Sequence, residues 1–193
     1  MSLLEKITLA AGLLWFVLEN ILNYVRRSGD KSKRYDQSSF LLIYITMTVC
    51  MFFGIGMMIY GKINGLGKIT AFDPLLGCFG LLVVFTGLAV RGIAILTLKK
   101  LFTVTVSIEK NHKIIDHGIY RYVRHPAYLG SLLICLGFGL AFENWISLLI
   151  VFLPVLFVFL NRIKIEEKVL ADNFGDEYKK YALKTKRLIP GVF

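Results

Sequence analysis

The sequence predicts an all-α, polytopic membrane protein with about five transmembrane helices. The first observation is composition, because 56% of the 193 residues are hydrophobic and the charged residues are clustered. The second is run length: residues 38–60 contain no charged residue. A run of about 20 apolar residues crosses the hydrocarbon core as a helix, which satisfies its backbone internally. The third is that basic residues fall in short segments between apolar runs, as in loops that face anionic lipid.

The spans follow one another with few interruptions. The turn Glu143-Asn144 separates the last two apolar segments, which therefore predict a tight helical hairpin. An amphipathic helix is expected to extend the fifth span as far as Gly175, and a second helical turn is expected over 177–183. The five predicted spans are residues 3–24, 38–60, 74–98, 127–142 and 145–161.

The loops predict an orientation. Basic residues are concentrated in 25–37, in 99–125 and after residue 161. By the positive-inside rule these segments are cytoplasmic and the N-terminus is outside. The net charge of +10 is then explained by contact with membrane lipid, and no nucleic-acid partner is expected. Two polar segments, 99–125 and 162–193, meet on the cytoplasmic side, where a binding site is expected.

Two ionisable residues interrupt the spans and require partners. Arg91 lies about two helical turns before Lys99, so it is expected to extend its side chain to the cytoplasmic interface. Glu19 lies near the inner end of the first span and is given a structural role.

All three histidines, His112, His117 and His125, lie in the 99–125 segment. No cysteine accompanies them and their spacing matches no common zinc pattern, so no metal site is expected. Pro126 suits the first turn of the fourth span and keeps His125 out of the helical region. Tyr120, Tyr122 and Tyr128 are expected to surround His125; an alternative is a belt of Tyr and Arg that anchors a helix end at headgroup depth.

Arg162 and Glu166 share one helical face at the end of the fifth span. They form either a surface ion pair of little energetic consequence or a site where Arg162 binds a lipid-linked anion through its planar fork.

These motifs together resemble the isoprenylcysteine carboxyl methyltransferase family, within a wider group that includes phospholipid N-methyltransferases. The likeness covers roughly 99–193. It rests on the block 118–128 (Gly-Ile-Tyr-Arg-Tyr-Val-Arg-His-Pro-Ala-Tyr), the hydrophobic hairpin, Glu166-Glu167, the block 175–181 (Gly-Asp-Glu-Tyr-Lys-Lys-Tyr) and Pro190.

The resemblance implies one membrane methyltransferase domain over 1–193. Three spans would fill 1–98, and a cofactor-binding segment, the hairpin and C-terminal helices would fill 99–193. It implies S-adenosylmethionine as cofactor and a lipid-linked acceptor, preferably the carboxylate of a prenylcysteine-like substrate. Arg162 would bind that carboxylate and form the catalytic pair with Glu166. The implied cofactor-binding residues are His112, Lys113, Ile114, Ile115, Tyr120, His125, Pro126, Ala127, Tyr128 and Glu166.

Three other functions remain open. A phospholipid amine N-methyltransferase would use the same cofactor and would need a general base, for which His125 or Glu166 is available. A membrane reductase of the sterol-reductase type would bind NADPH, with basic residues for the 2′-phosphate supplied by Lys110, Lys113, Arg121 and Arg124. A non-enzymatic membrane scaffold would bind no cofactor and would leave the 112–128 cluster unexplained.

Overall fold

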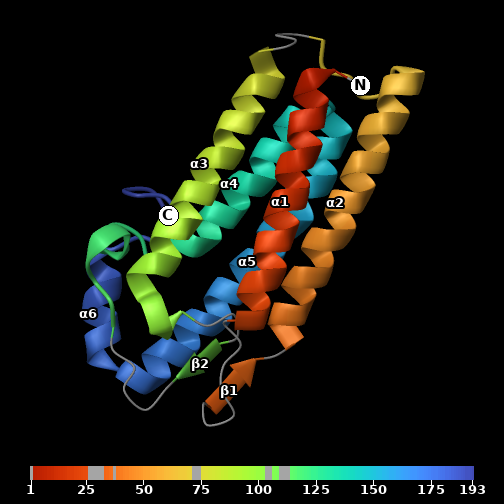
Figure 1. Cartoon of the computed structure of the whole chain (residues 1–193). Helices are drawn as coiled ribbons and strands as arrows, with labels where there is room; N and C mark the ends of the chain where they lie inside the picture. The colour runs from red at the N-terminus through yellow and green to blue at the C-terminus, as the bar shows by residue number, and fades with distance from the viewer. Residues whose placement is uncertain (1, 26–32, 37, 71–74, 103–105, 109–113) are drawn as a thin grey trace.

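The computed structural model describes residues 2–25, 33–36, 38–70, 75–102, 106–108 and 114–193 (Figure 1). Within these ranges the regular secondary structure is helical apart from two short strands. The elements in chain order are α1 (Leu3–Val25), β1 (Lys33–Asp36), α2 (Ser38–Asn64), α3 (Leu75–Leu98), the 3₁₀ turn η1 (Lys99–Leu101), β2 (Val106–Ile108), the 3₁₀ turn η2 (Gly118–Arg121), α4 (Pro126–Ala141), α5 (Trp145–Phe174) and α6 (Asp176–Lys184).

Each predicted span corresponds to a helix, so the predicted fold class is confirmed. Four helices, α1, α2, α3 and α5, are long and apolar enough to cross a membrane, and α4 is a shorter apolar helix of 16 residues. The chain is therefore an integral, multi-pass membrane protein. The helix α5 continues well past the predicted span, as expected, and ends where Gly175 adopts a φ of 54°. Glycine tolerates this left-handed conformation, so the chain can turn there into α6.

Several connections lie at the two ends of the bundle, whereas the C-terminal tail runs along its side (Figure 1). At one end β1 pairs with β2, with Arg34 opposite Ser107, and the backbone N–H of Arg124 donates to the carbonyl of Lys186 at 2.7 Å. At the other end the N–H of Ile69 donates to the carbonyl of Glu143 at 2.8 Å. The three basic segments therefore share one end, as the charge pattern predicts. Neither strand was predicted. The β1 segment is polar, whereas residues 102–108 (Phe-Thr-Val-Thr-Val-Ser-Ile) alternate apolar and polar residues with period 2, a signal for β2 that the prediction of spans and loops overlooked.

Glycines bring the backbones of α3 and α4 into direct contact. A Cβ added at Gly87 would lie 2.7 Å from the carbonyl oxygen of Gly130, and one at Gly130 would lie 2.7 Å from the backbone nitrogen of Arg91. Further along the same seam, a Cβ at Gly80 would lie 2.4 Å from the nitrogen of Ala141. Small residues permit this close approach in membranes, where dispersion contacts between helices replace the hydrophobic effect. The helices α3 and α4 therefore form one closely packed wall.

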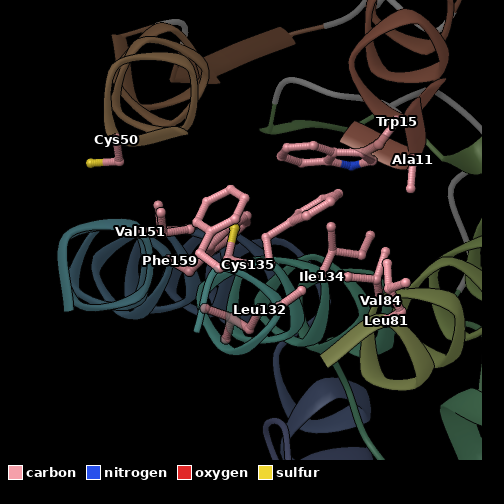
Figure 2. Close-up of a cluster of buried hydrophobic side chains, with 14 of the residues drawn as sticks. Ala11, Trp15, Cys50, Leu81, Val84, Leu132, Ile134, Cys135, Val151 and Phe159 are labelled. Carbon is pink, nitrogen blue, oxygen red and sulfur yellow. The ribbon is translucent and has the colours of Figure 1, made fainter. Parts of the chain in front are cut away.

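The buried core lies where α1, α2, α3, α4 and α5 face one another. Figure 2 shows Trp15 and Ala11 reaching from α1 toward α4, with Cys50 of α2 on the same side. The ring centroids of Trp15 and Phe138 are 5.9 Å apart. By contrast with the α3–α4 seam, only Thr8, Ala11 and Trp15 of α1 are buried. The helix α1 is therefore attached to the rest by few packing contacts.

Candidate functional site

A cavity of about 470 Å³ runs between the α1–α2 side and the α4–α5 side of the bundle. The two ends of the cavity differ in chemistry. Toward the β1–β2 end it is lined by polar and aromatic side chains, among them His125, Tyr128, Arg162, Glu166 and Tyr178. In the opposite direction it continues as an apolar arm along α1, α2 and α4, lined by Leu9, Gly12, Trp15, Met51, Ile55 and Phe138. The cavity is therefore suited to a ligand with a polar head and an apolar chain.

Arg162 is the buried cation of the polar end, with a relative exposure of 2%. Its Nε donates to the Tyr128 hydroxyl at 3.3 Å, and that hydroxyl donates to Oε2 of Glu166 at 2.6 Å. Its Nη1 also donates to the Ser39 hydroxyl of α2. The alternative of an exposed surface ion pair is therefore wrong, because α2, α4 and α5 all contribute to a buried polar cluster.

His125 adopts the predicted geometry. It precedes α4 with φ −123° and ψ 55°, and Pro126 begins the helix, which confirms both expectations. The backbone N–H of His125 donates to the carbonyl of Arg187 at 3.0 Å. Its ring stacks on Tyr128, with centroids 5.5 Å apart and planes 9° apart, and Nδ1 lies 3.8 Å from Oε2 of Glu166. Pro126 and the C-terminal tail thus hold the imidazole in the wall of the cavity.

Glu167 anchors the C-terminal tail, a role that sequence reasoning missed. Its Oε1 accepts from Nε of Arg124 at 2.9 Å, and its Oε2 accepts from Nε of Arg187 at 2.9 Å. The bond to Glu167 raises the pKa of Arg187. Helical spacing predicts contacts only between residues of the same helix, whereas Arg124 and Arg187 come from other segments. These bonds fix the chain on both sides of His125.

Besides Tyr128, three further tyrosines line the polar end, and two of them, Tyr178 and Tyr181, were not predicted as site residues. The Tyr181 hydroxyl donates to the carbonyl of Tyr120 at 2.8 Å, and the rings of Tyr178 and Tyr181 lie 6.2 Å apart. Burial raises the pKa of Tyr120 and Tyr178, so both phenols stay neutral. Tyr122 is 61% exposed and does not line the cavity, so its expected place beside His125 is wrong.

Most of the predicted site residues are brought together in this cavity. Pro126 is buried at the start of α4 and is not part of the lining. His112 and Lys113 lie outside the described residues. Among the residues that the structure describes, no group of three or more His, Cys, Asp or Glu is arranged to hold a metal ion. The predicted residues that line the cavity are Ile114, Ile115, Tyr120, His125, Ala127, Tyr128, Arg162 and Glu166.

Arg91 does not extend to the interface, so that expectation is wrong. Its Nε and Nη2 donate to the two carboxylate oxygens of Glu19 at 2.6 and 2.9 Å, and its Nη1 donates to the carbonyl of Ala127 at 3.1 Å. Glu19 and Arg91 both line the cavity. A charge inside the membrane is costly unless it is paired, and Glu19 supplies that partner.

Fold and site together define a class: a multi-pass membrane protein with a cavity that joins a polar, aromatic pocket to an apolar arm. The model of the isoprenylcysteine carboxyl methyltransferase (ICMT) family matches residues 79–172, and the resemblance predicted from the motifs is thereby confirmed. The matched region begins in α3, earlier than expected, and covers α4 and nearly all of α5. It ends before the 175–181 block and Pro190, which were also part of the expected likeness.

Individual relatives agree with that family. The chain is 37% identical over 115 residues to a probable protein-S-isoprenylcysteine O-methyltransferase of rice, covering 58% of this chain and 60% of the relative. It is 34% identical over 133 residues to the protein-S-isoprenylcysteine O-methyltransferase of Saccharomyces cerevisiae, covering 68% and 54%. The match thus spans little more than half the length of these curated relatives.

A solved structure extends the likeness beyond the matched region. It is a eukaryotic intramembrane Ras methyltransferase, ICMT, with a TM-score of 0.59 and 26% sequence identity. The superposition covers 81% of this chain and 54% of that one.

Proposed function

We propose that this protein is a membrane methyltransferase that uses S-adenosylmethionine to methylate the carboxylate of a lipid-linked, prenylcysteine-like acceptor. The observation that carries the proposal is Arg162, a buried guanidinium at the point where a polar pocket joins an apolar arm. A guanidinium binds a carboxylate through two parallel hydrogen bonds. The relatives named as isoprenylcysteine methyltransferases support the same reaction.

The residues of the polar end fit the proposed cofactor, which supplies an activated methyl group when bound. A sulfonium cation is attracted to aromatic faces, and Tyr120, Tyr178 and Tyr181 offer them. Glu166 adds a negative charge on the same side. From the family resemblance we assign His112, Lys113, Ile114, Ile115, Tyr120, His125, Pro126, Ala127 and Tyr128 to cofactor binding as well.

The chain's own residues position the reaction. A carboxylate is ionised at neutral pH, so no general base is needed at the acceptor. Arg162 orients the acceptor carboxylate, and Tyr128 and Ser39 in turn orient Arg162. The apolar arm holds the lipid chain of the acceptor out of water. Correct placement of two reactants removes a large part of a barrier of this kind.

A methyl-transfer assay tests the proposal. Protein in lipid nanodiscs is incubated with cofactor that carries a labelled methyl group and with one acceptor at a time: N-acetyl-S-farnesylcysteine, phosphatidylethanolamine or a prenylated quinone precursor. We expect a base-labile methyl ester on the farnesylcysteine. Label on phosphatidylethanolamine alone would contradict the proposed acceptor. Calorimetric binding of NADPH without binding of S-adenosylmethionine would favour a reductase and contradict the methyltransferase.

We also propose that the polar end faces the cytoplasm, with the N-terminus outside. The basic segments share that end, and the positive-inside rule assigns it to the cytoplasm. Cysteines introduced at Leu66 and Leu183, both exposed, report the two ends in a variant that lacks native cysteines. In sealed, right-side-out vesicles a membrane-impermeant maleimide should label Leu66→Cys and reach Leu183→Cys only after permeabilisation. The reverse pattern would overturn the orientation.

A further inference from the structure

We propose that the Glu19–Arg91 ion pair is a positioning device that sets α1 against the first turn of α4 and so shapes the apolar arm that receives the acceptor's lipid chain. This inference rests on the proposed function. Arg91 was expected to extend to the interface and Glu19 was given a structural role, and neither is among the residues that the family resemblance assigns to the site.

A single guanidinium connects three helices. Arg91 belongs to α3. Its Nε and Nη2 donate to the Glu19 carboxylate of α1, and its Nη1 donates to the carbonyl of Ala127 in α4. The side chains of Arg91 and Glu19 are 13% and 15% exposed. Bidentate geometry of this kind fixes both the distance and the orientation of its partners. The pair therefore sets the position of α1 along its helix axis and its rotation about that axis.

Stability alone does not account for the pair. Desolvation of two buried charges offsets most of their attraction, and well-packed apolar residues of similar volume are often equally stable. The pair does fix the orientation of α1 relative to α3 and α4. The helix α1 buries only Thr8, Ala11 and Trp15, so packing leaves its position weakly defined. An oriented bond matters more at such a helix than at the closely packed α3–α4 seam.

The position of α1 decides the shape of the apolar arm. Leu9, Gly12, Leu13 and Phe16 of α1 line the cavity, and Trp15 packs on Phe138 of α4. Figure 2 shows Trp15 lying over the α4 side of this cluster. A shift of α1 would move all of these side chains together. The polar end depends on α1 far less, since its residues come mainly from α4, α5 and α6.

The decisive variant removes both charges together, Glu19→Leu with Arg91→Met, so that no unpaired charge is left in the membrane. If the pair positions α1, the KM for N-acetyl-S-farnesylcysteine should rise about tenfold or more, because small misplacements of a bound substrate are costly. The dissociation constant for S-adenosylmethionine should rise by a smaller factor than the acceptor KM, since Arg91 also bonds to the carbonyl of Ala127, and resistance to unfolding should be retained. The matched control is Asp176→Leu with Lys179→Met, which removes an exposed pair from α6.

A second readout does not depend on activity. With Trp145→Phe in the background, Trp15 is the sole tryptophan and is 6% exposed. Lipids with brominated chains should quench its fluorescence weakly in the otherwise unchanged protein and strongly in the double variant. The positioning role would be overturned if bromolipids did not quench Trp15 in the double variant, or if its KM for the acceptor were unchanged. It would also be overturned if the variant lost affinity equally for acceptor and cofactor, or if it failed to fold. A parent protein that neither binds S-adenosylmethionine nor methylates an acceptor would refute the proposed function, while the quenching experiment would still decide the role of the pair.

Discussion

Replacement of Arg162 by methionine is expected to lower kcat/KM for a carboxylate acceptor by about 30- to 3,000-fold, which corresponds to roughly 2–5 kcal/mol. The reason is that a buried acceptor carboxylate would be left without its partner. Steady-state kinetics with each substrate varied in turn measure the effect. Cofactor binding should change far less, because Arg162 is assigned to the acceptor.

Arg162→Lys should also be damaging. An ammonium is a point charge and cannot reproduce the planar fork. Two of its three N–H donors would be needed for Tyr128 and Ser39, so it could not also make two parallel bonds to a carboxylate. Lys164→Met provides the matched control, since it removes a positive charge from an exposed position of the same helix. Equal kinetics for the Arg162 and Lys164 variants would exclude Arg162 as the acceptor site.

His125→Ala is expected to raise the dissociation constant for S-adenosylmethionine by about tenfold or more, since a hydrogen bond to a charged group contributes roughly 1.5–3 kcal/mol. The imidazole lies in the cavity wall beside Tyr128 and Glu166. Isothermal titration measures the constant directly. The variant should remain folded, because the backbone bond from residue 125 to the carbonyl of Arg187 does not need the side chain.

The matched control for that experiment is His117→Ala, an exposed histidine of the same segment. It should bind cofactor as the parent protein does. A His125→Ala variant that binds cofactor equally well would remove the assignment of the 114–128 segment to cofactor binding.

The spans were predictable because lipid imposes a simple requirement: about 20 apolar residues and a helix that satisfies its own backbone. The geometry at His125 was predictable for a similarly local reason, since Pro126 restricts the residue before it. The short 16-residue α4 was still recognised, because the turn Glu143-Asn144 marks its end.

The long-range polar contacts were not predictable from periodicity. The pairing rule for helices compares residues three or four positions apart, whereas Arg91 finds Glu19 on another helix. Glu167 likewise finds Arg124 and Arg187 on other segments. Such pairs depend on how the helices are arranged, and an intramembrane charge indicates only that some partner must exist.

The glycine seam between α3 and α4 limits how this protein can diverge. A Cβ atom added at Gly80, Gly87 or Gly130 would collide with main-chain atoms of the opposite helix. Substitution of any of these glycines therefore requires the two helices to move apart. On α1 the constraint is relaxed: a Cβ at Gly12 would meet only the Phe138 ring, at 3.7 Å. The region that matches the family begins at residue 79 and thus leaves out α1 and α2. The closely packed wall of α3 and α4 should therefore vary little among relatives, whereas the sequence of α1 should vary with the lipid chain that it accommodates.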